Sequence, residues 1–337
     1  MDDLASRVLA GDTRAAARLC RLVDDRGAGY PDLMRALHAA RPAPAYVVGI
    51  TGSPGAGKST LVAGLVTAFR AAGGKVAVVA VDPTSPFSGG AILGDRIRMQ
   101  SHFEDPGVFI RSLATRGAMG GLSRSARDVV RVLEAWGAGV VLLETVGVGQ
   151  DEIDVTLVAD STVVVVAPGQ GDDIQAIKAG ILECADVFVV NKADRPGAES
   201  AVTDLENMLA LGALSFAAQG ATVTHATSRF QPPAGAVGEG WTPPIVPTVA
   251  TRAEGVPELV RCLGEHRAWL QTEPGRARRR ARAEGLLRAW LRDEIAEAVS
   301  GQLSGAISSA TESVLARELD PHTAVERLVA DFRALSS

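Results

Sequence analysis

The stretch GITGSPGAGKSTLV, residues 49–62, decides the fold of this chain. It opens as a β-like apolar run, passes through small residues, and continues from Lys58 into an apolar helical pattern. Residues 52–59 fit the pattern G-x-x-x-x-G-K-[S/T] in full, between an expected strand and an expected helix. We therefore predict a phosphate-binding loop. A glycine-rich turn that binds nothing is the weaker alternative.

The loop also indicates how a nucleoside triphosphate would be held. Glycines let successive backbone N–H groups converge on phosphate oxygens at the positive end of the following helix. Lys58 is placed to bridge the β- and γ-phosphates, and the Ser59 hydroxyl to ligate Mg²⁺. The expected nucleotide contacts in this stretch are Ser53, Pro54, Gly55, Ala56, Gly57, Lys58, Ser59 and Thr60.

Short apolar runs elsewhere in the chain predict the architecture around this loop. We expect strands at 46–50, 75–82, 108–113, 140–145, 161–168, 187–191 and 245–250. The runs are apolar throughout, as in parallel strands that helices cover on both faces. Strand–helix alternation then predicts a doubly wound, mostly parallel α/β sheet. The expected division is a helical extension over 1–44 with two helices, a P-loop domain over 45–256, and a helical extension over 257–337.

A second motif, Asn191-Lys192-Ala193-Asp194, closes an apolar run and selects the base. The Asp194 carboxylate can accept hydrogen bonds from both the N1–H and the exocyclic amine of guanine, a pair of donors that adenine lacks. We expect Asn191 to brace the loop and the alkyl stem of Lys192 to cover the base plane. Following a complete phosphate loop at the carboxyl end of a strand, the motif favours GTP and GDP over ATP.

Carboxylates end two further strands and are candidate magnesium contacts. Glu144 lies in LLETVGVGQDE (142–152), and Asp82 lies in VDPTSPFSGGAILGDRIRM (81–99), which also holds Asp95. Mg²⁺ keeps several waters and takes carboxylates through them, so three acids around one ion are compatible with it. Asp82 taken alone would equally fit a turn cap at a strand end. With Ser59, these acids form the predicted metal set.

The segment after Glu144 is a candidate switch. The Gly147 N–H could sense the γ-phosphate, so residues 145–152 are expected to respond to hydrolysis. Gln150 could orient the attacking water, although a solvent-facing amide is an equally good interpretation. Because no glutamine stands at the usual place, we predict slow intrinsic hydrolysis that a partner accelerates.

Composition excludes several classes of function. A net charge of −5 argues against a general nucleic-acid surface, and the basic run at 275–282 is expected to be a solvated helix face. Three scattered cysteines indicate a reducing compartment and argue against a structural zinc site. No apolar run approaches the roughly 20 residues that cross a bilayer, so we expect a cytoplasmic protein without membrane contact.

Together these motifs, with GDTRAAARL (11–19), FIRSLATRGAMGGLS (109–123) and PGQGDDIQAIKAGILECAD (168–186), resemble the MeaB/ArgK family along nearly the whole chain. Members of that family are G-protein chaperones of adenosylcobalamin-dependent acyl-CoA mutases. The resemblance implies a G domain of the signal-recognition-particle-like class that hydrolyses GTP. It also implies a homodimer built through helical extensions, and binding to a mutase, with methylmalonyl-CoA mutase favoured. There the family gates loading or removal of cobalamin and protects the mutase from inactivation.

The resemblance also assigns residues. It places the magnesium acids on Asp82, Asp95 and Glu144, and it gives Lys178 a part in partner-stimulated hydrolysis, where chemistry alone would suggest a solvated charge. The expected catalytic set is therefore Lys58, Asp82, Glu144 and Lys178. In the last guanine loop, Ala250 would offer its N–H to guanine O6, while Val249 replaces the serine usual in the family.

Three other functions fit the same broad fold. A nickel-delivery GTPase would need Cys/His ligand clusters, which this chain does not show in its sequence. A P-loop kinase would need an acceptor pocket with a base and has no need to select guanine. A pure binding module would have no use for the lysine, serine and acids together. Which acyl-CoA mutase is served stays open at this stage.

Overall fold

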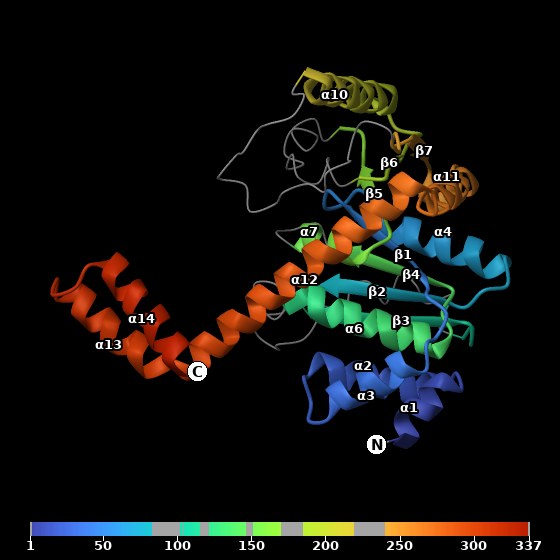
Figure 1. Cartoon of the computed structure of the whole chain (residues 1–337). Helices are drawn as coiled ribbons and strands as arrows, with labels where there is room; N and C mark the ends of the chain where they lie inside the picture. The colour runs from blue at the N-terminus through green and yellow to red at the C-terminus, as the bar shows by residue number, and fades with distance from the viewer. Residues whose placement is uncertain are drawn as a thin grey trace. The chain divides into compact units, whose positions relative to one another are not determined.

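The computed structural model describes residues 2–82, 102, 104–114, 121–145, 151–169, 185–218 and 240–335. Seven parallel strands form one sheet in the order β3-β2-β4-β1-β5-β6-β7 (Figure 1). The strands are β1 (Tyr46–Gly52), β2 (Val76–Asp82), β3 (Val108–Ala114), β4 (Val140–Thr145), β5 (Ser161–Val166), β6 (Val187–Asn191) and β7 (Ile245–Thr248). Each one lies on a predicted apolar run, so the doubly wound parallel sheet is confirmed.

Helices cover both faces of this sheet. Alternate strand residues divide between two cores. Val79 and Val141 pack on the side of α2 (Thr13–Asp24) and α6 (Gly121–Trp136), whereas Val78 and Leu142 pack on the side of α4 (Lys58–Ala71) and α11 (Val256–Trp269) (Figure 1). Burial on both faces explains why the strands are apolar throughout. The described helices of the sheet region are α4 (Lys58–Ala71), α6 (Gly121–Trp136), α7 (Asp151–Val158), α10 (Ala198–Ala218), the 3₁₀ turn η2 (Ala250–Arg252) and α11 (Val256–Trp269).

The N-terminal segment forms three helices, not the two predicted. They are α1 (Asp2–Leu9), α2 (Thr13–Asp24) and α3 (Tyr30–Ala39). Gly11 has a φ of 81°, and the Asp12 side chain accepts hydrogen bonds from the N–H groups of Arg14 (2.8 Å) and Ala15 (3.1 Å). A left-handed glycine followed by an N-capping aspartate ends one helix and starts the next. The apolar spacing continues across this break, which is why periodicity alone merged the two helices.

The chain divides into two compact units, Met1–Glu284 and Gly285–Ser337. The first holds the whole sheet, and the predicted boundaries after residues 44 and 256 both lie inside it. The last three helices are α12 (Glu273–Gln302), which begins in the first unit, then α13 (Ser304–Leu315) and α14 (Pro321–Leu335). Among the helices of the described ranges, none has the length and apolar character needed to cross a membrane.

Strand order determines where a ligand can bind. β1 lies between β4 and β5, and the chain leaves it toward β2 on one side and later toward β5 on the other. In an open parallel sheet, the crevice at such a reversal lies outside the carboxyl ends of the strands. Gly52, Glu144 and Asn191 stand at or beside those ends. The fold thus brings the two nucleotide motifs and one predicted acid to the same edge.

Candidate functional site

The phosphate loop joins β1 to α4 and depends on glycine at two close approaches. Gly52, Gly55 and Gly57 have φ values of 130°, 76° and 95°. A Cβ at Gly52 would lie 2.0 Å from the backbone oxygen of Val165, and one at Gly57 would lie 2.3 Å from Nδ2 of Asn191. At Gly55, no atom of the described residues lies within 4 Å of that position. The loop is therefore packed at its ends and open at its centre, as a phosphate cradle needs to be.

Lys58 and Ser59 open α4 at the base of this cradle, followed by Thr60. The Lys58 ammonium donates to the carbonyl oxygens of Gly52 (2.7 Å) and Ser53 (3.0 Å), and the residue is 6% exposed. The Gly57 N-cap places the positive end of α4 at the same point. A buried ammonium and a helix N-terminus side by side favour a multiply charged anion.

The Ser59 hydroxyl donates to Oε1 of Glu144 at 2.6 Å, and both side chains are buried. These are oxygen ligands of the kind Mg²⁺ prefers, so the residues present fit that ion. Within the described ranges, no group of three or more His, Cys, Asp or Glu side chains could hold a metal by itself. Phosphate oxygens and water would have to complete the coordination. Asp82 ends β2, but its side chain lies outside the described part of the structure.

Asn191 ties the guanine motif to two other loops. Its Nδ2 donates to the Ala56 carbonyl at 2.7 Å, while its Oδ1 accepts from the Thr248 hydroxyl (3.2 Å) and from the Ala250 N–H (3.1 Å). The Asn191 side chain is buried, so these bonds satisfy polar atoms that water cannot reach. The bracing expected of Asn191 is thus present in the hydrogen-bond pattern. The Ala250 N–H points to Asn191 here, and its role toward guanine O6 stays a prediction.

The rest of the motif surrounds the open side of the loop. Lys192 has a φ of 59°, and its ammonium donates to the Gly55 carbonyl at 2.7 Å. Asp194 is 42% exposed, and its Oδ2 lies 3.6 Å from a guanidinium nitrogen of Arg252. Sequence reasoning did not single out Arg252, although it follows Ala250 by two residues. Asp95, Gly147, Gln150 and Lys178 lie outside the described residues.

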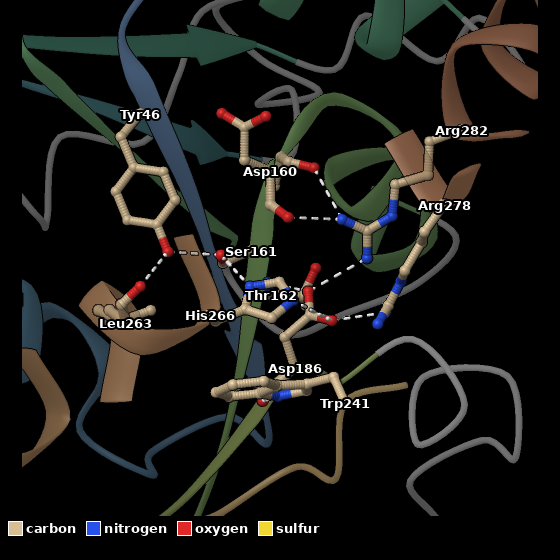
Figure 2. Close-up of polar contacts among 11 residues, drawn as sticks. Tyr46, Asp160, Ser161, Thr162, Asp186, Trp241, Leu263, His266, Arg278 and Arg282 are labelled. Carbon is tan, nitrogen blue, oxygen red and sulfur yellow. Dashed lines mark hydrogen bonds and ion pairs between the residues drawn. The ribbon is translucent and has the colours of Figure 1, made fainter. Parts of the chain in front are cut away.

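A buried polar network lies at the opposite edge of the sheet, where β5 and β6 begin (Figure 2). Asp186 is fully buried, and its carboxylate pairs with Arg278 (2.5 Å) and Arg282 (3.1 Å) and accepts from the Thr162 N–H (2.8 Å). The network corrects the expectation that the basic run at 275–282 is a solvated face. Arg278 and Arg282 stand four residues apart on α12 and turn inward to one carboxylate.

His266 extends this network toward β1. Its Nδ1 contacts the Ser161 hydroxyl, which contacts the Tyr46 hydroxyl, both at 2.5 Å, and Tyr46 donates to the Leu263 carbonyl at 2.9 Å. Burial lowers the pKa of His266 to about 4 against the opposing attraction of Asp186, so the imidazole is neutral. Burial acts to raise the pKa of Asp186, but Arg282 and Arg278 together lower it, so Asp186 is ionised. Ser161, His266 and Asp186 resemble a hydrolytic triad in composition, but their complete burial excludes a substrate.

Comparison with known proteins shows the family and the fold of the chain. The family described as methylmalonyl-CoA mutase-associated GTPase MeaB matches residues 17–304. A Pyrococcus horikoshii protein assigned as a GTPase is 44% identical over 97% of this chain and 96% of its own. The fused isobutyryl-CoA mutase of Cupriavidus metallidurans is 41% identical over 202 residues, which are 59% of this chain and 18% of that protein. Among solved structures, the LAO/AO transport system kinase covers 98% of this chain and 97% of its own with a TM-score of 0.67; at 23% identity it shows the shared fold alone.

Proposed function

The chain belongs to the MeaB family of methylmalonyl-CoA mutase-associated GTPases, and on that premise we propose that its GTP hydrolysis serves an adenosylcobalamin-dependent acyl-CoA mutase. Methylmalonyl-CoA mutase is the favoured client, and the proposed task is to gate cobalamin loading or removal and to protect the mutase from inactivation. The observation that carries the link to a mutase is the fused relative. There, a segment 41% identical to this chain belongs to a protein named as an isobutyryl-CoA mutase.

The site geometry supports the nucleotide half of this proposal. Asn191 hydrogen-bonds to the phosphate loop and to the loop after β7, so the base-reading and phosphate-binding elements form one bonded unit. Lys58, now bonded to the Gly52 carbonyl, would balance charge on the β- and γ-phosphates, and Ser59 and Glu144 would hold Mg²⁺ with Asp82 and Asp95. Bound Mg²⁺ would neutralise phosphate charge during transfer to water.

Hydrolysis would be slow until a partner completes the site. Within the proposal, Gly147 senses the γ-phosphate and Lys178 acts when the mutase binds. Loss of the γ-phosphate would then change the segment at 145–152 and release or re-dock the mutase. In such a cycle, GTP hydrolysis switches the complex with the mutase between bound and released states. This role fits a chaperone better than a kinase.

We also propose that the protein works as a homodimer. Leu287, Leu291 and Ile295 lie at four-residue spacing on α12 and are 63%, 62% and 47% exposed. Side chains at this spacing share one helix face, and leaving three large apolar groups in water is unfavourable. A second copy of the same face would cover them.

The decisive experiment measures GTP turnover with methylmalonyl-CoA mutase, with isobutyryl-CoA mutase and without either. We expect stimulation by one mutase and its co-purification in a nucleotide-dependent way. Lys58→Ala should abolish tight GTP binding and the stimulation with it. If neither mutase binds or stimulates in the GTP or the GDP state, the chaperone proposal fails while the GTPase assignment stands.

A further inference from the structure

Arg252 is held by its backbone at the edge of the base-reading loop. It ends η2, and its N–H donates to the Val249 carbonyl at 2.9 Å. The next residue, Ala253, has a φ of 56°, and the Val249 N–H closes the turn on the Glu254 carbonyl at 3.0 Å. This tight turn leaves Arg252 little freedom to leave the neighbourhood of Asp194.

Glu254 also fixes the plane of the Arg252 guanidinium. Its Oε1 accepts from Nε at 2.7 Å, and its Oε2 accepts from Nη2 at 3.3 Å. Two nearly parallel bonds to one carboxylate orient a guanidinium far better than one. The remaining nitrogen, Nη1, lies 3.6 Å from Oδ2 of Asp194. At that distance the contact is an ion pair rather than a hydrogen bond.

We propose that Arg252 is a positioning residue for base specificity, which acts through Asp194. The inference rests on the proposed guanine reading by Asp194. A carboxylate offers about four acceptor directions, and guanine needs two of them for its N1–H and its 2-amino group. Arg252 stands close enough to restrain the carboxylate without consuming those directions. The held cation thus presents Asp194 to the base in one orientation.

Charge balance at the pocket points the same way. Asp194 and Glu254 carry two negative charges beside a site for an anionic nucleotide, and Arg252 lies between them. Removing the cation would leave the carboxylates of Asp194 and Glu254 near each other without the positive charge that now lies between them. Because Asp194 and Arg252 are 42% and 54% exposed, solvent screens the interaction and a moderate effect is expected.

A matched pair on α11 provides the control. Arg261 also contacts two carboxylates, Glu258 and Glu265, and is 55% exposed. It lies on the surface of α11, and its side-chain contacts within the described residues are with Glu258, Glu265 and Cys262. If Arg252 has no effect on base binding, the Arg252→Ala variant should have the same nucleotide affinities as the Arg261→Ala variant.

The experiment measures GDP and IDP affinities by displacement of a fluorescent nucleotide. Exposed ion pairs of this kind correspond to about a twofold to fivefold change in affinity. We expect Arg252→Ala to weaken GDP binding by that factor. It should weaken IDP binding less, because inosine lacks the 2-amino group. Arg252→Lys should be intermediate, since it keeps the charge and loses the fork, and Arg252→Glu should be worse than Arg252→Ala.

A double-mutant cycle separates positioning from loop folding. In the Asp194→Asn background, Arg252→Ala should cause no further loss of GDP affinity. The inference is overturned if Arg252→Ala changes the GDP affinity no more than Arg261→Ala does. It is also overturned if Arg252→Ala lowers the GDP and IDP affinities equally and lowers the GDP affinity further in the Asp194→Asn background. Equal wild-type affinities for GDP and ADP would overturn the guanine reading itself. If the wild type prefers GDP to ADP but the Arg252 variants bind GDP and IDP as the wild type does, this inference alone is overturned.

Discussion

Gly52 shows how one residue fixes the start of the phosphate loop. It ends β1 opposite Val165 of β5, and its φ of 130° is in the region that side chains avoid. The backbone of β5 occupies the place where a Cβ would be. Sheet pairing and loop geometry therefore both require glycine at this position.

We predict that Gly52→Ala lowers the free energy of unfolding by about 3–5 kcal/mol, because a rigid backbone carbonyl cannot move aside. Gly55→Ala is the matched control: its φ is also positive, at 76°, but its Cβ position is clear of described atoms. It should cost about 1–2 kcal/mol from backbone strain alone. Urea denaturation of both variants measures the difference. Equal losses would show that backbone strain, and not the approach of β5, requires Gly52.

At this scale, a function can be predicted from sequence most directly where consecutive residues encode it. The phosphate loop and the guanine motif are contiguous, so their backbone chemistry can be inferred without knowing the fold. Arg252 and Asp186 escaped notice because their roles depend on partners distant in the chain. An arginine looks the same in sequence whether it faces water or a buried carboxylate.

Among the elements, β6 connects two polar sites. It begins after Asp186, which anchors α12, and it ends at Asn191, which braces the nucleotide loops. The stretch between them is buried and apolar. The first part of the last long helix is thus fastened to the strand that carries the base-reading motif.

We predict that Arg278→Ala destabilises the first unit by about 2–4 kcal/mol. Removing one partner leaves the buried Asp186 charge less compensated, although Arg282 remains in contact with it. Arg280→Ala is the control, because Arg280 lies in the same basic run but is exposed. That change should stay within about 0.5 kcal/mol. Thermal and urea unfolding of both variants test the expectation, which fails if the two behave alike.

The neutral state of His266 predicts a dependence of stability on pH. Its pKa is about 4 in the folded chain against 6.5 as the ordinary value, so only the unfolded chain binds the proton between those limits. The contribution of neutral His266 to the free energy of unfolding is therefore complete above pH 6.5 and is lost as the pH falls toward 4. The shift corresponds to about 3 kcal/mol. In His266→Gln this part of the acid destabilisation should vanish, and unfolding at pH 7, 6, 5 and 4 measures it; identical pH profiles would contradict the assignment.

In the molecule as a whole, the architecture could be predicted because a short apolar run in the sequence indicates each strand. The parallel order then follows from the alternation of strands and helices. The chain's division could not be inferred in the same way. α12 is one continuous helix that starts in the first unit and ends in the second, so no composition shift marks Glu284. The apolar residues Leu287, Leu291 and Ile295 of the second unit have the same four-residue spacing as residues on a buried helix face, so the sequence pattern does not show that they are exposed. Only solvent exposure distinguishes the two kinds of face.

That exposed face yields the last prediction, which concerns assembly. Leu291→Glu places a charge in the middle of the face formed by Leu287, Leu291 and Ile295, so it should convert a dimer of 34.9 kDa chains to monomers or raise the dimer dissociation constant at least about tenfold. Ser300→Glu is the control, since at 100° per residue Ser300 lies on the opposite side of α12. Light scattering across a concentration series reports the mass. A monomeric wild type, or a dimer indifferent to Leu291→Glu, would show that a second copy does not cover this face.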